Sequence, residues 1–359
     1  MTDKELFDLN ITAPDKDIFD RAKLSWDSLA KPIDGLGIFE TLVCKIAAIQ
    51  GQVNPDIGKK ALIIMCADNG VVCENVTQTD QSVTRDVASL MSKRASSVGV
   101  MTLNYALDIM PVDIGINSET KIENVIDKRI RRGAGNILNE PAMRKDECLD
   151  AIKVGIDLVK QCSENGYKII ATGEMGIGNT TTSTALLCAL TGKDPELITG
   201  RGAGLSDEGL KNKINVIKNS LIYHDLYDKR ALDRKDALNA LMKVGGLDIA
   251  GLAGVFIGGA LYRIPVVIDG FISAVSALCA DLMMPGVKEY MIASHTGKEK
   301  GTALVLEYLK LKAVIDADMN LGEGTGAVLM MPMLDMAMSL YNCGTRFTDT
   351  DIKEYERFK

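Results

Sequence analysis

Short apolar segments that each lead into a turn rich in glycine or acidic residues recur along most of this chain, and helical patterns separate them. The segments and their turns are Ala61–Ala67 with Asp68-Asn69-Gly70, Ile109–Val112 with Asp113-Ile114-Gly115, Ile169–Thr172 with Gly173-Glu174, Val266–Ile268 with Asp269-Gly270, Tyr290–Ala293 with Ser294-His295, and Val314–Asp318 with Gly322-Glu323-Gly324. They lack clean apolar–polar alternation, as expected of strands buried on both faces. Strands that alternate with helices predict an α/β fold with a doubly wound, mostly parallel sheet of about six strands.

Acidic side chains then fall where these strands end. In open parallel sheets ligands bind at the edge formed by the carboxyl ends of the strands. Any one of these acids could simply cap the next helix. Because the whole set faces the same edge, we expect it to mark a binding site.

Composition excludes several classes of protein. The chain has 48 acidic and 41 basic residues among 359, a formal net charge of -7, and no basic face interleaved with aromatic residues, which argues against nucleic-acid binding. The longest uncharged apolar stretch, Ile249–Tyr262, has 14 residues and falls short of the roughly 18 that a membrane span needs. Its four glycines favour a tightly packed helix in a soluble core.

Cysteine and histidine usage points to a reducing compartment without a zinc site. The eight cysteines form no C-x-x-C pair, so we expect reduced core thiols and a cytoplasmic protein. His224 and His295 are the two histidines of the sequence, too few for a dedicated His/Cys zinc site. No metal and no cofactor is predicted.

The strongest local motif is Gly173-Glu174-Met175-Gly176-Ile177-Gly178-Asn179-Thr180-Thr181, which follows a strand and precedes a predicted helix over Thr184–Leu190. Glycines let the backbone approach a ligand, and free N–H groups at a helix start attract phosphate. Gly173 and Gly178 have the spacing of a P-loop, but Asn179 stands where that motif has lysine. The loop therefore favours a smaller anion, such as a monophosphate, over ATP. A helix cap without a ligand is the alternative.

Two further loops carry candidate groups. Gly200-Arg201-Gly202-Ala203-Gly204 precedes a helix that contains Lys213, which could reach a phosphate or could be a solvated lysine. Leu321-Gly322-Glu323-Gly324-Thr325-Gly326-Ala327 places one carboxylate between glycines, where it suits a general base or a helix-start acid. His295 could be a scaffold residue or a catalyst. Neither a G-x-S-x-G elbow nor a full dinucleotide fingerprint is present, which argues against a hydrolase of that type and a dehydrogenase.

These loops, together with Asp269-Gly270-Phe271, resemble in content and order the nicotinate-nucleotide–dimethylbenzimidazole phosphoribosyltransferase family of cobalamin lower-ligand synthesis. The resemblance covers roughly residues 20 to 345. It implies a pentosyltransferase that moves 5-phosphoribose from nicotinate mononucleotide to a base, giving an α-riboside 5'-phosphate and nicotinate. It also implies a small helical domain, 1–50 plus 328–359, beside a large domain, 51–327, and either a homodimer or a heterodimer with a paralogue.

The resemblance assigns roles to individual residues. Glu323 takes the position of the general base, and Glu174 lies in the same pocket. Gln81 and Leu321 take positions on the acceptor side. The phosphate of the nucleotide is expected among Gly176, Gly178, Asn179, Thr180, Gly202 and Lys213.

Departures from the family pattern concern the acceptor. The usual A-D-H-G reads Ala67-Asp68-Asn69-Gly70, an aromatic–proline pair is replaced within Thr77-Gln78-Thr79-Asp80-Gln81, and Gly301-Thr302 stands where a second histidine is usual. The acceptor is therefore left open among benzimidazoles, adenine and phenol or p-cresol. The alternative function is a weakly active or inactive paralogue that binds nucleotide and supports a partner subunit.

Overall fold

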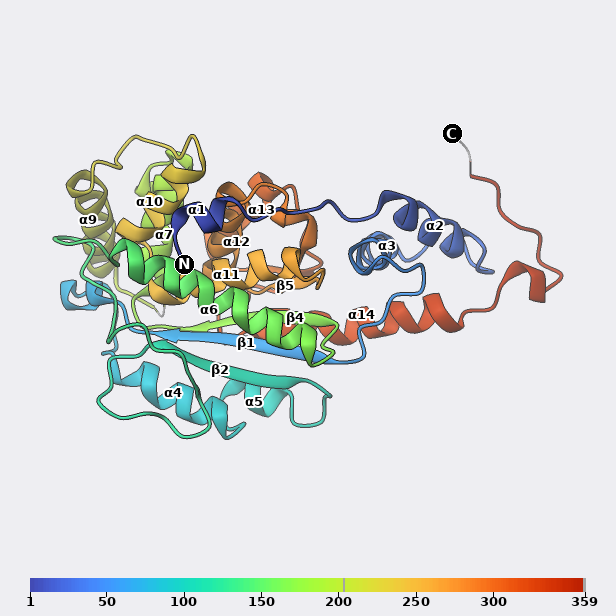
Figure 1. Ribbon diagram of the computed structural model, residues 1–359, viewed down its shortest axis with the longest axis horizontal. Coiled ribbons are helices and arrows are strands. Elements are labelled where there is room, and N and C mark those ends of the chain that lie inside the picture. The colour runs from blue at the N-terminus through green and yellow to red at the C-terminus, as the bar shows by residue number, and fades with distance from the viewer. Residues whose placement is uncertain (203, 358–359) are drawn as a thin grey trace.

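A parallel sheet of six strands forms the centre of the molecule. The computed structural model describes residues 1–202 and 204–357, and its sheet has the strand order β3-β2-β1-β4-β5-β6, with every neighbouring pair parallel (Figure 1). The strands are β1 (Lys60–Ala67), β2 (Asp108–Gly115), β3 (Ile126–Asp127), β4 (Ile169–Met175), β5 (Val266–Ile268) and β6 (Met291–Ala293). The predicted doubly wound α/β fold is confirmed, and the order reverses between β1 and β4.

Helices cover both faces of the sheet. They are α1 (Asp3–Phe7), α2 (Lys16–Asp27), α3 (Ile38–Gln50), α4 (Ser82–Ser92), α5 (Ser97–Met101), α6 (Lys145–Glu164), α7 (Asn179–Thr191), α8 (Pro195–Ile198), α9 (Asp207–Tyr223), α10 (Arg234–Val244), α11 (Leu247–Leu261), α12 (Phe271–Met283), α13 (Lys300–Leu309) and α14 (Thr325–Cys343). Short 3₁₀ turns occupy Gly70–Glu74, Val287–Tyr290 and Phe347–Asp349.

The residues of β1 divide between two hydrophobic clusters because successive side chains point to opposite faces. Ala61, Ile63 and Met65 belong to the cluster beneath α6, α11 and α12, and all eight residues of the strand are buried. Leu62 and Ile64 belong to the cluster that contains residues of α3 and α14. Burial on both faces explains why the strand shows no alternation in sequence.

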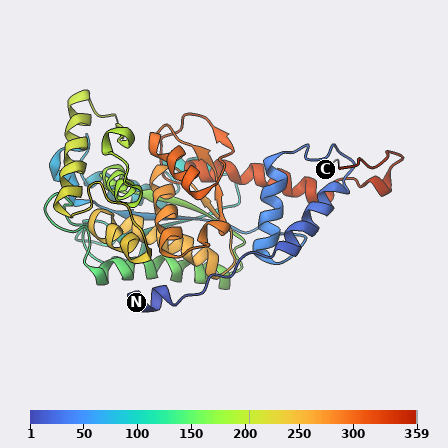
Figure 2. The same cartoon turned by 90° about the horizontal axis from the view of Figure 1, so that it is seen from above.

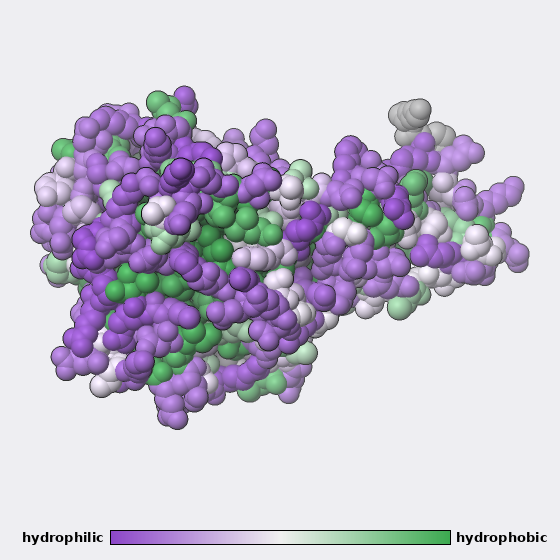
Figure 3. All heavy atoms as spheres, in the orientation of Figure 1, coloured by the Kyte–Doolittle hydropathy of each residue, from purple (hydrophilic) through white to green (hydrophobic). Residues whose placement is uncertain are grey.

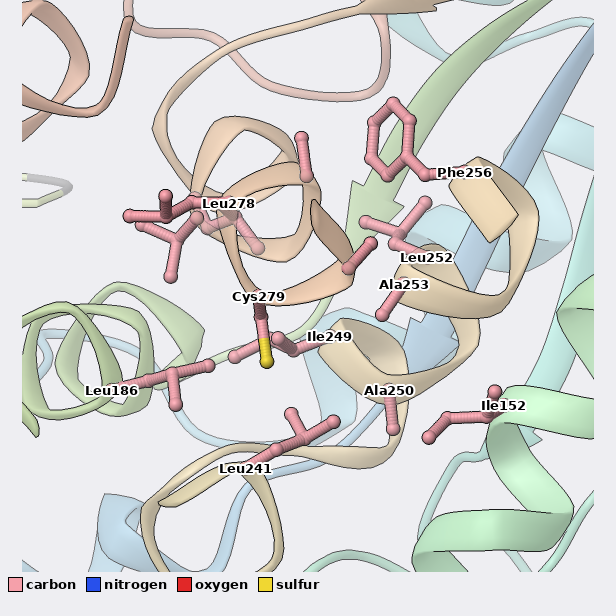
Figure 4. Packing of buried hydrophobic residues seen from close by; sticks show 14 of the residues in the cluster. Ile152, Leu186, Leu241, Ile249, Ala250, Leu252, Ala253, Phe256, Leu278 and Cys279 are labelled. Carbon is pink, nitrogen blue, oxygen red and sulfur yellow. The ribbon is translucent and has the colours of Figure 1, made fainter. Parts of the chain in front are cut away.

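The glycine-rich stretch of α11 is a helix packed in the core. A Cβ atom on Gly254 would lie 2.0 Å from the carbonyl oxygen of Ile152 on α6, so the two backbones touch. Figure 4 shows α11 side chains such as Ile249 and Leu252 facing neighbouring helices, with Cys279 of α12 beside them. Within residues 1–202 and 204–357, no helix combines the length and the apolar character that crossing a membrane requires.

The surface is mostly hydrophilic on the face drawn in Figure 3, with hydrophobic residues showing in patches between polar ones.

All eight cysteines are free, and six are buried. The expectation of core thiols is wrong for Cys73 and Cys343, which are exposed.

One end of the molecule is helical. α2, α3, the second half of α14 and the C-terminal tail lie together there, away from the sheet (Figures 1 and 2). α1 lies instead with the large body, because Leu6 belongs to the cluster beneath α11. The division into 1–50 plus 328–359 and 51–327 stays a prediction. After the 3₁₀ turn Phe347–Asp349 the chain continues without helix to residue 357, and residues 351–357 are exposed.

Two predicted elements differ in the structure. The Val314–Asp318 segment does not join the main sheet: the N–H groups of Val314 and Ile315 donate to the carbonyl of Ser294, beyond the end of β6. It supplies β8 (Ile315–Asp316), which pairs with β7 (His295–Thr296), while the sixth strand of the sheet is β3. The helix predicted over Thr184–Leu190 is α7, and it begins at Asn179 because Gly178 is its N-cap.

Candidate active site

A cavity of about 320 Å³ lies at the carboxyl edge of the sheet, beyond the ends of β4, β5 and β6. Its walls come from the predicted loops and their neighbours: Glu174–Thr180, Asp269–Ser273 and Met319–Glu323 are continuous lining segments. Parallel sheets place their ligand sites at this edge, next to the reversal of strand order. The sequence-predicted acids and glycines are thus brought to one place.

The first glycine loop passes close over the end of β1. A Cβ atom on Gly176 would lie 2.5 Å from the carbonyl oxygen of Ala67 and 2.7 Å from Oδ2 of Asp248. Gly178 has φ of 92°, in the left-handed region, and caps α7. Glycine is therefore required at both positions, by close approach at the first and by backbone conformation at the second. The N-terminus of α7 opens towards the cavity through Asn179 and Thr180.

Lys213, Thr180 and Gly202 converge from three different segments. Lys213 on α9 is 1% exposed, and its Nζ donates to Oγ1 of Thr180 at 2.7 Å. A Cβ atom on Gly202 would lie 3.2 Å from that hydroxyl and 3.5 Å from Nζ. Thr180 and Gly202 line the cavity, and the loop's Ala203 lies outside the described residues.

The charge of Lys213 is not neutralised within the protein. None of the ion pairs in the described chain involves it, whereas the neighbouring Arg201 is paired with Asp207. Burial lowers the pKa of Lys213 to about 8, and the charge of Glu299 opposes that effect. A buried cation beside a hydroxyl and a helix N-terminus suits a phosphate group, which would restore its full charge.

Glu174 is the second-last residue of β4 and is 9% exposed. Its Oε2 accepts a hydrogen bond from Nδ2 of Asn179, which also donates to Oδ2 of Asp248 at 3.0 Å. Burial raises the pKa of Glu174 to about 8, and the charges of Asp248, Asp269 and Glu323 add to the rise. Burial therefore favours the protonated form of this carboxyl.

Glu323 sits in a backbone conformation that side chains rarely adopt. Its φ is 58°, between 83° at Gly322 and 84° at Gly324. Its Oε2 accepts from the N–H of Val98 at 3.0 Å. A Cβ atom on Gly173 would lie 2.9 Å from the carbonyl oxygen of Glu323, so the loop rests on the end of β4. Glu323 is the one non-glycine residue among these three, so it carries a backbone strain of the kind that is common at functional sites, and it lines the cavity.

Asp269 anchors this loop, a role that the sequence did not reveal. Its carboxylate accepts from the N–H groups of Gly324, Gly326 and Ala327 at 3.2, 2.8 and 3.1 Å, at the start of α14. Burial raises its pKa, and the neighbouring His295 opposes the rise. Asp269 thus fixes the backbone on which Glu323 sits.

His295 has a packing role in this arrangement. It is 4% exposed, its Nδ1 lies 2.9 Å from Oγ of Ser294, and a Cβ atom on Gly326 would come within 2.0 Å of that nitrogen. Its ring therefore fits against the N-terminus of α14 only because residue 326 is glycine. This contact favours the scaffold interpretation of His295.

The predicted acceptor residues lie apart. Leu321 is exposed and lines the cavity, whereas Gln81 is not among the lining residues. Gln81 donates to the carbonyl of Asn69 at 3.0 Å and accepts from Asn117. The same segment reaches the cavity through Val76, Thr77 and Gln78. The acceptor role of Gln81 stays a prediction, and the described residues contain no cluster of three or more potential metal ligands.

Comparison with known proteins gives a consistent result. A family model described as phosphoribosyltransferase matches residues 11–352. The nicotinate-nucleotide–dimethylbenzimidazole phosphoribosyltransferase of Acetivibrio thermocellus is 43% identical over 95% of both chains, and that of Clostridium acetobutylicum is 40% identical over 97% of both. The crystal structure of CobT from Thermus thermophilus covers 94% of this chain and 100% of its own, at 33% identity and a TM-score of 0.88. The chain therefore belongs to the nicotinate-nucleotide–dimethylbenzimidazole phosphoribosyltransferase family and is a pentosyltransferase.

Proposed function

We propose that this enzyme moves 5-phosphoribose from nicotinate mononucleotide to an aromatic base or phenol, with Glu323 as general base. Family membership supports the coarser statement that it is a nicotinate-nucleotide:base phosphoribosyltransferase of cobalamin lower-ligand synthesis. The observation that carries the finer proposal is that one cavity contains both the Thr180 and Gly202 corner, with Lys213 directly behind it, and the loop that carries Glu323.

The phosphate of the nucleotide occupies the corner formed by Thr180, Gly202 and Lys213. Here the backbone can approach closely at the glycine, the hydroxyl can donate, and the lysine supplies charge. The cavity extends from this corner to Glu323, so the ribose can lie between them. Holding both reactants in line would supply a large share of the rate acceleration.

The transfer itself needs one proton acceptor. A nitrogen or oxygen of the acceptor attacks C1' of the ribose while Glu323 takes the acceptor's N–H or O–H proton. The bond between C1' and the pyridinium nitrogen breaks, its electron pair stays on that nitrogen, and nicotinate leaves with a neutral ring. Since the leaving group carries its positive charge before departure, no strong acid is required. Attack from the face opposite nicotinate converts a β-riboside into an α-riboside.

The acceptor is set, in this proposal, by the segment 69–81, which departs from the family pattern and lines the cavity through Val76, Thr77 and Gln78. The enzyme is incubated with nicotinate mononucleotide and a panel of benzimidazoles, adenine and phenols, and free nicotinate is measured. We expect release that depends on the acceptor and extends beyond 5,6-dimethylbenzimidazole. Activity with 5,6-dimethylbenzimidazole alone would contradict the argument from these departures.

The same panel separates the enzyme from its alternative, a paralogue that binds nucleotide and supports a partner subunit. An active enzyme releases nicotinate by itself. Nucleotide binding without release for any acceptor would favour the supporting role. Whether the chain works as a homodimer or with a paralogue stays a prediction.

A further inference from the structure

Asp248 lies behind the cavity, in the first turn of α11, and is fully buried. It does not line the cavity, whereas Glu174 and Asn179 do. The amide nitrogen of Asn179 donates one hydrogen to Oδ2 of Asp248 and the other to Oε2 of Glu174. A single amide group therefore bridges a carboxyl in the cavity and a carboxyl outside it.

Two glycines hold Asp248 in place. A Cβ atom on Gly176 would lie 2.7 Å from Oδ2, and one on Gly246 would lie 2.6 Å from Oδ1. Oδ1 is buried without a hydrogen-bond partner among the described residues, and Oδ1 of Asn69 lies across the same glycine. The space fits this carboxylate closely, so its position fixes the orientation of the Asn179 amide.

The groups that face this pair carry the same sign of charge. Around Glu174 they are Asp248 from α11, Asp269 after β5 and Glu323 before α14, and around Asp248 the additional carboxyl is Asp68 after β1. The largest contributions at the two carboxyls include no lysine or arginine. Two buried carboxyls without a cation cannot both ionise at low cost.

Burial raises the pKa of both carboxyls, and it raises that of Glu174 more, which favours the proton of the pair on Glu174. Oε2 of Glu174 accepts from Asn179, which leaves Oε1 to carry the proton. Oε1 has no partner among the described residues, and a Cβ atom on Gly322 would lie 2.6 Å from it, at the wall of the cavity.

We propose that Asp248 is a positioning residue for the transfer reaction, which acts through the Asn179 amide to hold Glu174 as a neutral acid whose Oε1 donates a hydrogen bond to an oxygen of the bound nucleotide. The inference rests on the proposed function for the identity of that nucleotide. An ionised Glu174 would instead repel the carboxylate and phosphate oxygens of an anionic substrate.

The test is the pH profile of kcat/KM for nicotinate mononucleotide in Asp248→Asn, because kcat/KM reports ionisations of the free enzyme. Removing one negative charge next to Glu174 lets that group lose its proton more easily. We expect the high-pH limb of the profile to move to lower pH by about one unit. The control is Asp86→Asn, which removes the same charge at an exposed position of α4 and should leave the limb unmoved.

A role confined to folding would lower kcat/KM at every pH without moving the limb. A limb at the same pH in Asp248→Asn and the wild type would overturn the proposal.

A second measurement applies even where Asp248→Asn fails to fold. The wild-type infrared spectrum at pH 7 should contain the stretching band of a protonated, buried carboxyl, and Glu174→Gln should lose it. A wild-type spectrum without that band would also overturn the proposal. Since this readout needs no turnover, a protein that shows the band but uses no acceptor would refute the proposed function and leave the assignment of the proton intact.

Discussion

The two walls of the cavity are built from glycine loops at strand ends, but they hold opposite charges. Behind one wall, next to Thr180, lies the buried Lys213, which forms no ion pair among the described residues. The other wall contains Glu174, Asp269 and Glu323, which likewise form no ion pair there. On each side, buried ionisable groups lack a partner of opposite charge, and such groups lower the stability of a folded protein. In the proposed function this difference divides the work: the side with Lys213 would bind an anion, and the side with the carboxyls would accept or hold a proton.

The largest effect is expected from Glu323→Gln, which keeps the size of the side chain and removes its ability to accept a proton. Turnover should fall by about 10²-fold or more, because general-base help is typically worth that much. Binding of nicotinate mononucleotide, measured by calorimetry, should be retained. Weakened binding with normal turnover at saturation would show that Glu323 binds the nucleotide instead of accepting a proton, and the contrast between the two walls would not hold.

The next effect is expected on the opposite wall. Lys213→Met should raise the KM for nicotinate mononucleotide by about 10- to 100-fold, the typical worth of a hydrogen bond to a charged group, with a smaller change in kcat. The control is Lys211→Met, an exposed lysine two residues earlier on the same helix. Unchanged kinetics in Lys213→Met would show that Lys213 does not contribute to binding of the nucleotide.

The same substitution should stabilise the free protein, because it removes a buried and unpaired cation. We expect the free energy of unfolding near pH 7 to rise by roughly 1–3 kcal/mol, measured by urea titration. A loss of stability would show that Lys213 is compensated inside the protein after all.

A smaller effect concerns Glu174 and pH. Burial raises the pKa of Glu174 in the folded protein to about 8, from an ordinary value of 4.5. Between these values the folded state binds more protons than the unfolded state, so this group makes stability fall as pH rises. The free energy of unfolding of Glu174→Gln should therefore rise, relative to that of the wild type, by roughly 1–3 kcal/mol as the pH increases from 5 to 8.

Urea titrations at the two pH values check this prediction. Glu307→Gln, at an exposed position of α13, is the control and should follow the wild type. A Glu174→Gln variant with the pH dependence of the wild type would show that Glu174 titrates as an ordinary carboxyl.

Sequence patterns predicted the sheet because its strands are buried on both faces and therefore appear as apolar runs. They failed at β3, which has two residues and no such run. They also failed at Val314–Asp318, where the N–H groups of Val314 and Ile315 donate to the carbonyl of Ser294, outside the main sheet. An apolar run shows that a segment is buried, but it does not show which strand the segment pairs with.

The candidate site was predictable as far as its residues lie in glycine loops. Glu174, Glu323 and most of the residues predicted to hold the phosphate lie in such loops, and Lys213 lies on the helix that follows one of them. Asp248 was missed because it stands just before the apolar stretch Ile249–Tyr262, which drew attention as a possible membrane segment. The path of the segment 69–81 also depends on tertiary contacts, which is why Gln78 reaches the cavity and Gln81 bonds elsewhere.

The most direct test of the account is the configuration of the product. The enzyme is supplied with nicotinate mononucleotide and the best acceptor from the panel, and the anomeric proton of the riboside phosphate is examined by NMR. In-line attack opposite nicotinate predicts an α-riboside 5'-phosphate formed in equal amount to the nicotinate released. A β-riboside, or ribose 5-phosphate without a base attached, would contradict it.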